Sequence, residues 1–220
     1  MMTRTGNDLR KPPTRKQVRA SIDQADQSFR TCWQTLISLK KVELDGCALI
    51  DFQPALASAL FKLDDVYRRL VRHRGLLIRR KASYSPTRFR QRMRALSQDL
   101  EALRTAMSVG RNLGDAFAWI FYQYDQPSLE LHFKNPANPH TPPGIGGRGE
   151  LEFIKHVRLP GFLTIYHGIT TFLRIGDVSF FNPVTGRISA IGELKSKLAE
   201  PGTLIVRMHS IQRERIPFIN

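Results

Sequence analysis

Apolar residues recur at intervals of three and four along much of residues 20–110, which is the spacing of one face of an α-helix. The first expected helix, 20–39, carries its apolar face on Phe29, Trp33, Leu36 and Leu39. A second helix is expected from Asp51, a typical N-cap residue, to about Gly75. The stripe of the second consists of Leu56, Leu60, Leu63, Tyr67 and Leu70.

A third helix is expected to begin at Ser85, an N-cap, with Pro86 in its first turn. We expect Gly110 to end it and residues 112–124 to form a separate, short apolar helix. The apolar stripe of this third helix, before Gly110, consists of Phe89, Met93, Leu96, Leu100, Leu103 and Met107. Because the second and third helices carry matching stripes, they should pack as an antiparallel hairpin. The same stripes could instead join copies of the chain into a homo-oligomer.

Residues 134–149 hold four Pro and four Gly among sixteen residues, a composition typical of a loop. The glycines could cradle a phosphate, but no strand leads into them and the Lys-Ser/Thr ending of a phosphate-binding loop is missing. The chain is therefore expected to fall into four parts: a disordered basic arm (1–20), a helical region (21–125), a Pro/Gly-rich linker loop (126–148) and a second unit (149–220).

The second unit reads as one helix followed by four strands, the order of an α+β fold. The helix is "GELEFIKHV". The strands are "GFLTIYHGI", the two halves of "RIGDVSFFNPVTGRISAIGELKSK" and "TLIVRMHSI". We expect the two middle strands to form a hairpin around the turn "NPVTG", 182–186.

This hairpin carries charge where a core hairpin normally carries Val or Thr. Pairing Phe181 with Ile188 sets Asp177 one residue short of Glu193, and a one-residue bulge in the second strand would set the two level. Cross-strand neighbours lie roughly 5 Å apart. Two carboxylates at that distance repel each other unless a cation lies between them. The alternative is that Lys195, on the same face as Glu193, neutralises it on a solvent-facing side of the sheet.

These residues resemble the motif of the PD-(D/E)xK nuclease superfamily, the restriction-endonuclease-like fold. "IGD", 175–177, is similar to that family's "PD", with Gly176 in place of Pro, and "GELKSK", 192–197, is similar to its Glu-x-Lys strand. The resemblance covers about residues 147–215. It implies an α/β-type nuclease core of a helix and a meander. The family's second helix has no room between Lys195 and the last strand, so the core here is either trimmed or incomplete.

The resemblance also implies an activity, the metal-dependent hydrolysis of phosphodiester bonds in nucleic acid. Asp177 and Glu193 would bind Mg²⁺ or Mn²⁺, and Lys195 would assist the activation of water. Glu150, with Glu152 as second choice, would add a carboxylate from the helix. The neighbouring Ser196 and Lys197 would contact phosphate.

The charge of the chain agrees with a polyanionic partner. Its 220 residues carry a formal net charge of +15, and no acidic residue lies between Val66 and Gln98. A one-signed cluster of this kind favours binding of a nucleic-acid backbone, DNA first. An ordinary solvated face is the alternative. The residues that we expect to contact nucleic acid are Arg72, Arg74, Arg79, Arg80, Lys81, Arg88 and Lys197.

The remaining composition narrows the class of protein further. Cys32 and Cys47 indicate no disulfide framework, and no apolar run approaches a membrane span or a signal-peptide core. We therefore expect a cytoplasmic protein without a membrane partner. The six histidines have no metal-site spacing, and we expect His167 to be structural although it precedes Asp177 by one strand. A non-catalytic nucleic-acid-binding protein or a helical interaction protein remains the alternative function.

Overall fold

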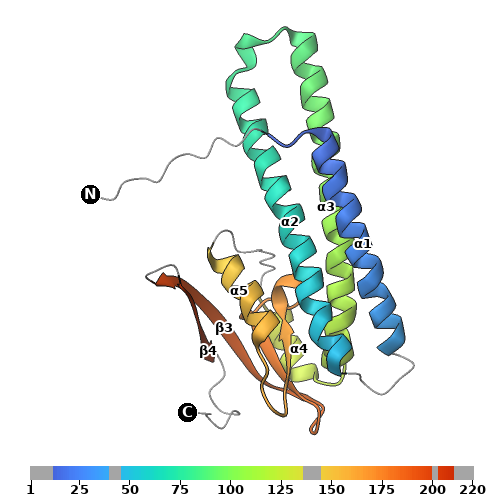
Figure 1. The fold of residues 1–220 in the computed structure, drawn as a ribbon, viewed down its shortest axis with the longest axis vertical. Helices are drawn as coiled ribbons and strands as arrows, with labels where there is room; N and C mark the ends of the chain where they lie inside the picture. Colours follow the sequence, from blue (N-terminus) through green and yellow to red (C-terminus); the bar gives the residue numbers. More distant parts are fainter. Residues whose placement is uncertain (1–11, 40–45, 136–144, 200–202, 211–220) are drawn as a thin grey trace.

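The computed structural model describes residues 12–39, 46–135, 145–199 and 203–210. Five α-helices in this part of the chain precede a four-stranded antiparallel sheet, as an α+β fold requires (Figure 1). The helices are α1 (Arg15–Leu39), α2 (Gly46–Arg79), α3 (Pro86–Tyr122), α4 (Gln126–Phe133) and α5 (Ile145–His156). The strands are β1 (Leu163–Tyr166), β2 (Val178–Asn182), β3 (Arg187–Ala199) and β4 (Thr203–Ser210). There are also two short 3-10 helices in the described residues. η1 (Lys81–Ser83) joins α2 to α3, and η2 (His167–Ile169) follows β1.

The three long helices form a bundle in which α2 and α3 are the predicted antiparallel hairpin and α1 packs along both (Figure 1). Ser85 caps α3 as predicted, since its hydroxyl accepts a hydrogen bond from the Arg88 backbone N–H. The two stripes are buried against each other within one chain. Their buried members are Leu56, Leu60, Leu63, Leu70, Leu96, Leu100 and Leu103. Trp33, expected on the core face of α1, is instead 54% exposed.

Gly110 does not end α3, which continues without a break to Tyr122 and includes the residues expected as a separate helix. At Gly110 and Gly114 of α3, the missing side chain lets a neighbouring segment pack directly against the helix backbone. A Cβ on Gly110 would lie 2.6 Å from the ring of Phe29, and one on Gly114 would lie 2.0 Å from the Ile169 carbonyl oxygen. A glycine costs a helix about 1 kcal/mol relative to alanine. Here that cost is offset because neighbouring segments can approach the helix axis.

Helix starts also differ from the sequence prediction. α1 begins at Arg15, within the segment expected to be a disordered arm, because Thr14 and Gln17 form a reciprocal cap. The earlier part of the expected arm, 1–11, lies outside the described residues. Asp51 lies inside α2, which begins at Gly46, and so caps nothing.

The linker expected at 126–148 contains two helical segments. α4 begins after Asp125, whose carboxylate accepts a hydrogen bond from the Ser128 backbone N–H. α5 begins at Ile145 and so includes the glycines that follow this residue. Gly149, which has no side chain, lets the helix pack closely against Ser196 of β3. The loop prediction stays a prediction for 136–144, which lie outside the described residues. Gly146, Gly147 and Gly149 lie inside α5 and not in a loop that precedes a helix, so they do not form the considered phosphate-binding loop.

The sheet has the order β1-β2-β3-β4, and its middle hairpin has the predicted register. Phe181 pairs with Ile188, and a shift next to Phe180 then pairs Val178 with Gly192. α5 packs between β3 and α2 (Figure 1).

Two polar side chains of the bundle fix the sheet to it. The Gln53 amide donates to the Thr164 carbonyl and accepts from the Tyr166 N–H, both at 2.7 Å, and so covers the free edge of β1. The Asp115 carboxylate accepts hydrogen bonds from both the backbone N–H and the hydroxyl of Thr171, at 2.6 Å each. Among the described helices, none combines the length and the apolar character that a membrane span needs.

Candidate functional site

Asp177 lies at the edge of β3, at the point where β2 has not yet begun. Its backbone N–H donates to the Gly192 carbonyl at 2.8 Å, and its Oδ2 accepts from the Leu194 N–H at 2.6 Å. The carboxylate thus takes the place of a strand residue that would otherwise bond Leu194. Because the N–H and C=O of a strand residue point to the same side, the Leu194 carbonyl also points toward this edge.

The bulge considered from the sequence is present and brings Asp177 next to Glu193, one step beyond the Val178 pair. The ammonium of Lys195 binds the Glu193 carboxylate directly. Both side chains are at least partly exposed. The solvent-side ion pair that the sequence offered as an alternative is therefore real, and it lies beside a second carboxylate.

The environment of the Asp177 carboxyl disfavours its charged form. Burial raises the pKa of the Asp177 carboxyl, and the Glu193 charge raises it further. The hydrogen bond from the Leu194 N–H and the Lys195 charge lower this pKa but do not cancel the increase. A cation at this edge would relieve the repulsion.

Glu150 approaches the site from α5 and is only 6% exposed. Its Oε2 accepts a 2.5 Å hydrogen bond from the Tyr166 hydroxyl. Burial raises the pKa of Glu150 to about 7, against the effect of that hydrogen bond, and the Asp177 charge raises it too. Glu152, the second choice, is paired with Lys155 at the surface of α5 and has no part in the site.

The three predicted carboxylates are arranged on two sides of β3. Ser196 faces α5, because a Cβ on Gly149 would lie 1.8 Å from the Ser196 hydroxyl oxygen. By strand alternation Glu193 points away from α5, whereas Glu150 lies on α5 itself, and Asp177 at the strand edge lies between them. In the described part of the chain no three His, Cys, Asp or Glu side chains form a group placed to hold one ion.

Two details of the resembling motif need correction. Ser196 was expected to contact phosphate, but its hydroxyl oxygen is buried against α5 without a hydrogen-bond partner. Gly176 adopts a φ of +65°, which proline cannot reach because its ring fixes φ near −65°. Glycine at this position is therefore a conformational requirement and not a neutral replacement for the family's Pro.

The exposed face of β3 continues as a basic surface that the sequence prediction missed in part. Lys195 pairs across the sheet with Arg207, and Glu193 pairs with His209. All of these basic side chains are exposed, as is the predicted Lys197 one step along β3. The alternation within "TLIVRMHSI" was the available signal, since an antiparallel last strand must place two of its residues beside Glu193 and Lys195.

A buried polar cluster beside Asp177 was not predicted at all. It joins His132 of α4, Tyr122 of α3, Ser179 of β2 and His167 of η2 through hydrogen bonds of 2.5–3.2 Å. These residues come from four separate elements, so no spacing in the sequence could have indicated them. His167 is structural, as expected.

The predicted nucleic-acid contacts of the helical region gather at the free end of the α2–α3 hairpin, which stands clear of the sheet (Figure 1). We call this end the hairpin tip. Its exposed basic residues are Arg72, Arg74, Arg79, Arg80, Lys81, Arg88, Arg90, Arg92 and Arg94. Two aromatic rings order it: Arg92 lies 4.9 Å from the centre of the Tyr84 ring, and Lys81 lies 5.9 Å from that of Phe89. Arg68, below the tip, is paired with Asp64.

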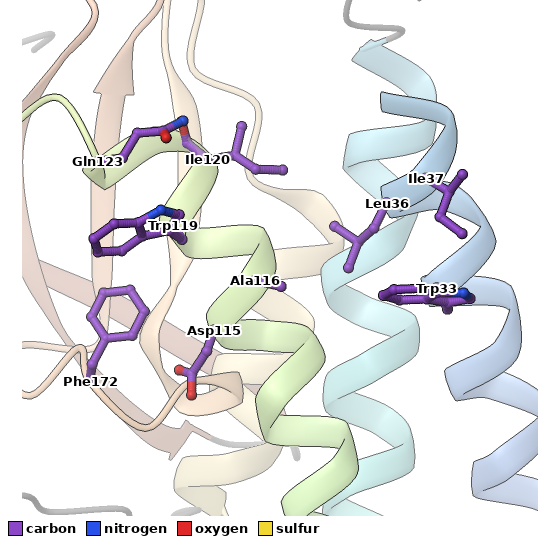
Figure 2. A pocket seen from close by; sticks show the side chains of 9 residues that line it. All are labelled: Trp33, Leu36, Ile37, Asp115, Ala116, Trp119, Ile120, Gln123 and Phe172. Atoms are coloured by element: carbon purple, nitrogen blue, oxygen red, sulfur yellow. The ribbon is translucent and has the colours of Figure 1, made fainter. Parts of the chain in front are cut away.

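A separate hollow of about 600 Å³ lies between α1, the end of α3 and the segment that follows η2 (Figure 2). Trp33 and Trp119 stand on its two sides, and Phe172 packs edge-on against Trp119. Its lining carboxylate, Asp115, already binds Thr171. The hollow is therefore apolar and offers no acid–base group.

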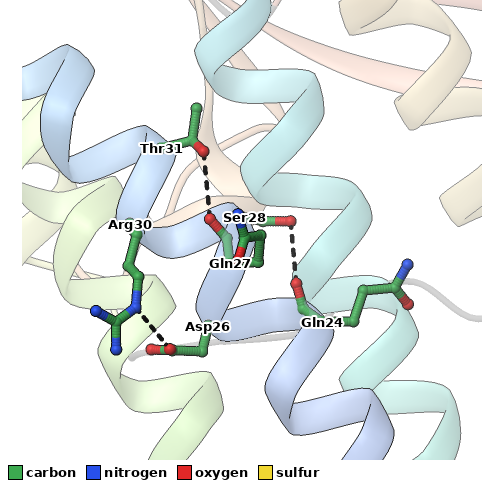
Figure 3. Close-up of polar contacts among 6 residues, drawn as sticks. All are labelled: Gln24, Asp26, Gln27, Ser28, Arg30 and Thr31. Carbon is green, nitrogen blue, oxygen red and sulfur yellow. Dashed lines mark hydrogen bonds and ion pairs between the residues drawn. The ribbon is translucent and has the colours of Figure 1, made fainter.

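The solvent face of α1 before Trp33 is polar and satisfied within the helix (Figure 3). Arg30 binds Asp26 at 2.8 Å, and the Thr31 hydroxyl donates to the Gln27 carbonyl at 3.2 Å. This face holds no candidate chemistry, so the edge of β3 remains the best candidate site in the described residues.

No family model, curated protein or solved structure matches this chain. The functional argument therefore rests on the residues themselves.

Proposed function

We propose that the chain is a metal-dependent nuclease that hydrolyses phosphodiester bonds of nucleic acid, with DNA as the favoured substrate. One observation carries the proposal: the Asp177 carboxylate lies at the edge of β3 beside Glu193, where burial and, to a smaller extent, the Glu193 charge raise the pKa of Asp177. Exposed basic side chains of β3 and β4 lie next to this position, and the hairpin tip adds a second basic surface at a distance.

The donors at this edge suit Mg²⁺ or Mn²⁺, which prefer oxygen ligands. Asp177 and Glu193 would supply carboxylate oxygens and Leu194 its carbonyl oxygen. Glu150, on the α5 side of β3, would contribute to a second ion. A bound divalent ion would lower the pKa of a coordinated water and offset charge on the phosphate.

Basic residues of the chain would position the attacking water and bind the phosphates. Lys195 would release one of its N–H donors from Glu193 to hold the attacking water or a nonbridging phosphate oxygen. Lys197 and Arg207, exposed on the same face of the sheet, would bind the neighbouring phosphates. The hairpin tip would bind the backbone farther from the scissile bond.

The test is plasmid nicking in Mg²⁺ or Mn²⁺ by purified Asp177→Asn and Glu193→Gln, with EDTA as the metal-free reference. Each variant should lose about 100-fold or more in cleavage rate, because it removes one ligand, while DNA binding in a gel-shift assay stays near that of the parent. Glu152→Gln is the matched control, since it removes an exposed carboxylate from α5 outside the site. If both site variants cut as well as the parent, the proposal is wrong.

The Glu193–Lys195 ion pair favours a second candidate, a nucleic-acid-binding protein that does not cut. In that case Glu193 is already neutralised and the edge has no need of a metal. Calorimetric titration with Mg²⁺ separates the two: the nuclease should take up the ion and lose that uptake in Asp177→Asn, whereas the binding protein should show no uptake at this site.

A further inference from the structure

Two buried histidines hold the backbone of residues 174–177, the first three residues through their imidazole rings and Asp177 through the His167 backbone. His132 Nδ1 accepts hydrogen bonds from the Arg174 N–H at 2.9 Å and the Ile175 N–H at 3.2 Å. The His167 ring lies 3.2 Å from the Gly176 carbonyl through its Nδ1. The His167 backbone N–H donates to the Asp177 carbonyl at 2.9 Å. Every residue of 174–177 is thus bound to one of the two histidines.

The hydrogen bonds determine which atom is the donor in each contact of the cluster, and so which nitrogen of each histidine carries the proton. Since His132 Nδ1 accepts two N–H groups, its proton lies on Nε2 and is donated to the Tyr122 hydroxyl. Tyr122 then donates to Ser179, and Ser179 donates to His167 Nε2. His167 therefore carries its proton on Nδ1, where it is donated to the Gly176 carbonyl. Both rings are neutral.

We infer that His132 and His167 are positioning residues for Asp177: they fix the 174–177 backbone so that the Asp177 carboxylate stays at the edge of β3. The segment needs this support because Gly176 holds a left-handed φ of +65° and β2 begins only at Val178, with the hydrogen bond from the Asp177 N–H to the Gly192 carbonyl as the first bond to β3. Within the described residues, the Asp177 carboxylate accepts one hydrogen bond, from the Leu194 N–H. The importance of this position for metal binding rests on the proposed function, but the positioning itself does not.

Asn and Gln replacements test the inference because they place the same amide group at different points of the imidazole. In His132→Asn the amide oxygen can take the place of Nδ1, whereas in His132→Gln it reaches only as far as Nε2. His167→Asn and His167→Gln differ in the same way with respect to the Gly176 carbonyl. The readout is hydrogen exchange at the Leu194 amide, measured by NMR relative to that of Ile191 in the same strand. This ratio cancels global stability.

The Gln variants should raise Leu194 exchange about 10-fold relative to Ile191, because the acceptor on Asp177 moves away, and the Asn variants should stay within about threefold of the parent. His156→Gln, which removes an exposed imidazole from α5, should leave the ratio unchanged. Equal ratios in parent, Asn and Gln variants would overturn the inference, and so would an equal loss in both, since that indicates a packing role only.

Calorimetry with Mn²⁺ on the same variants links the inference to the site. Affinity should fall about 10-fold in the Gln variants and recover in the Asn variants. If the parent takes up no Mn²⁺ while the Leu194 ratio still separates Asn from Gln, the positioning role stands and the proposed nuclease function fails. If the parent binds Mn²⁺ and all four variants bind it equally, the positioning role fails and the metal site stands.

Discussion

Glu150 is a carboxylate whose folded environment favours its protonated form. Its pKa is raised from 4.5 to about 7 chiefly by burial, so between these values the folded chain binds a proton that the unfolded chain has lost. The contribution of Glu150 to the free energy of unfolding therefore falls as the pH rises from about 4.5 to 7. Glu150→Gln removes this penalty, and its amide oxygen can still accept from Tyr166.

We therefore expect Glu150→Gln to stabilise the protein at pH 7.5 by roughly 2–3 kcal/mol and to change it little at pH 4.5. Urea unfolding in EDTA measures both values. Glu152→Gln, on the exposed side of the same helix, should show no such gain at either pH. A Glu150→Gln effect that does not change with pH would contradict the assigned cause.

The two buried histidines respond to pH in the opposite sense. Burial lowers the pKa of His132 from 6.5 to about 4 and that of His167 to about 3, so the unfolded chain binds protons that the folded chain excludes. Their stabilising contribution is complete above pH 6.5 and is lost as the pH falls. Two such groups outweigh the single gain from Glu150.

The parent should therefore lose roughly 2–3 kcal/mol of unfolding free energy between pH 7 and 4.5, followed by urea unfolding in EDTA. His132→Asn should reduce this loss by about half or more, because asparagine does not titrate. His156→Gln, at an exposed position of α5, should leave the pH profile unchanged. An equal acid loss in His132→Asn and the parent would exclude His132 as its source.

At the level of single elements, the two glycines of the α2–α3 hairpin that differ most in surroundings make a matched pair. A Cβ on Gly114 would lie 2.0 Å from the backbone oxygen of Ile169, which cannot move without shifting η2. A Cβ on Gly75 would meet nothing within 4 Å. Both positions are helical, so the gain in helix propensity is the same for each.

Gly114→Ala should therefore destabilise the protein by about 2 kcal/mol, because the clash exceeds the propensity gain. Gly75→Ala should stabilise it by roughly 0.5–1 kcal/mol. Thermal or urea unfolding distinguishes the two signs. Two changes of the same sign would show that the close approach of η2 to α3 is not what selects glycine at position 114.

The hairpin tip is an element whose function should show in the salt dependence of binding. Replacing Arg79, Arg80 and Lys81 with Ala removes three exposed cations without touching the buried stripes. If each contacts one phosphate, the slope of log K against log salt for duplex DNA should decrease in magnitude by roughly 3. Arg30→Ala, which removes an arginine already paired with Asp26, should leave the slope unchanged. An unaltered slope in the triple variant would leave the tip as a solvated face.

How much of this could be predicted from the sequence depends on the range of the interactions. The stripe of Leu56 and Leu60, the Ser85 cap and the Phe181–Ile188 register are local patterns, and all are confirmed. Gly110 was read as a helix stop because its partner Phe29 is 81 residues away in the chain. Contacts between separate elements, which no local pattern indicates, also form the His132–His167 cluster and the docking of Gln53 on β1.

On the scale of the whole molecule, the bundle sets the distance between the two basic regions. Gln53 of α2 lies level with the end of β1, and the neighbouring Tyr166 hydroxyl binds Glu150 at the carboxylate site. Arg79 lies at the far end of the same helix, so at 1.5 Å per residue the tip is roughly 30 Å or more from that level. A duplex that contacts both must be about nine base pairs long or longer, at 3.4 Å per pair.

Substrate length should therefore decide whether the hairpin tip contributes to cleavage. With duplexes longer than about 20 base pairs, the Arg79, Arg80 and Lys81 triple variant should lower kcat/KM by about 10-fold or more, mainly through KM, because the tip adds binding away from the scissile bond. With duplexes of about six base pairs, which cannot span both regions, parent and variant should cut at the same low rate. Asp177→Asn should abolish cleavage at every length. An equal loss on short and long duplexes would show that the tip acts at the carboxylate site itself or on the fold, and not as a distant contact with the same duplex.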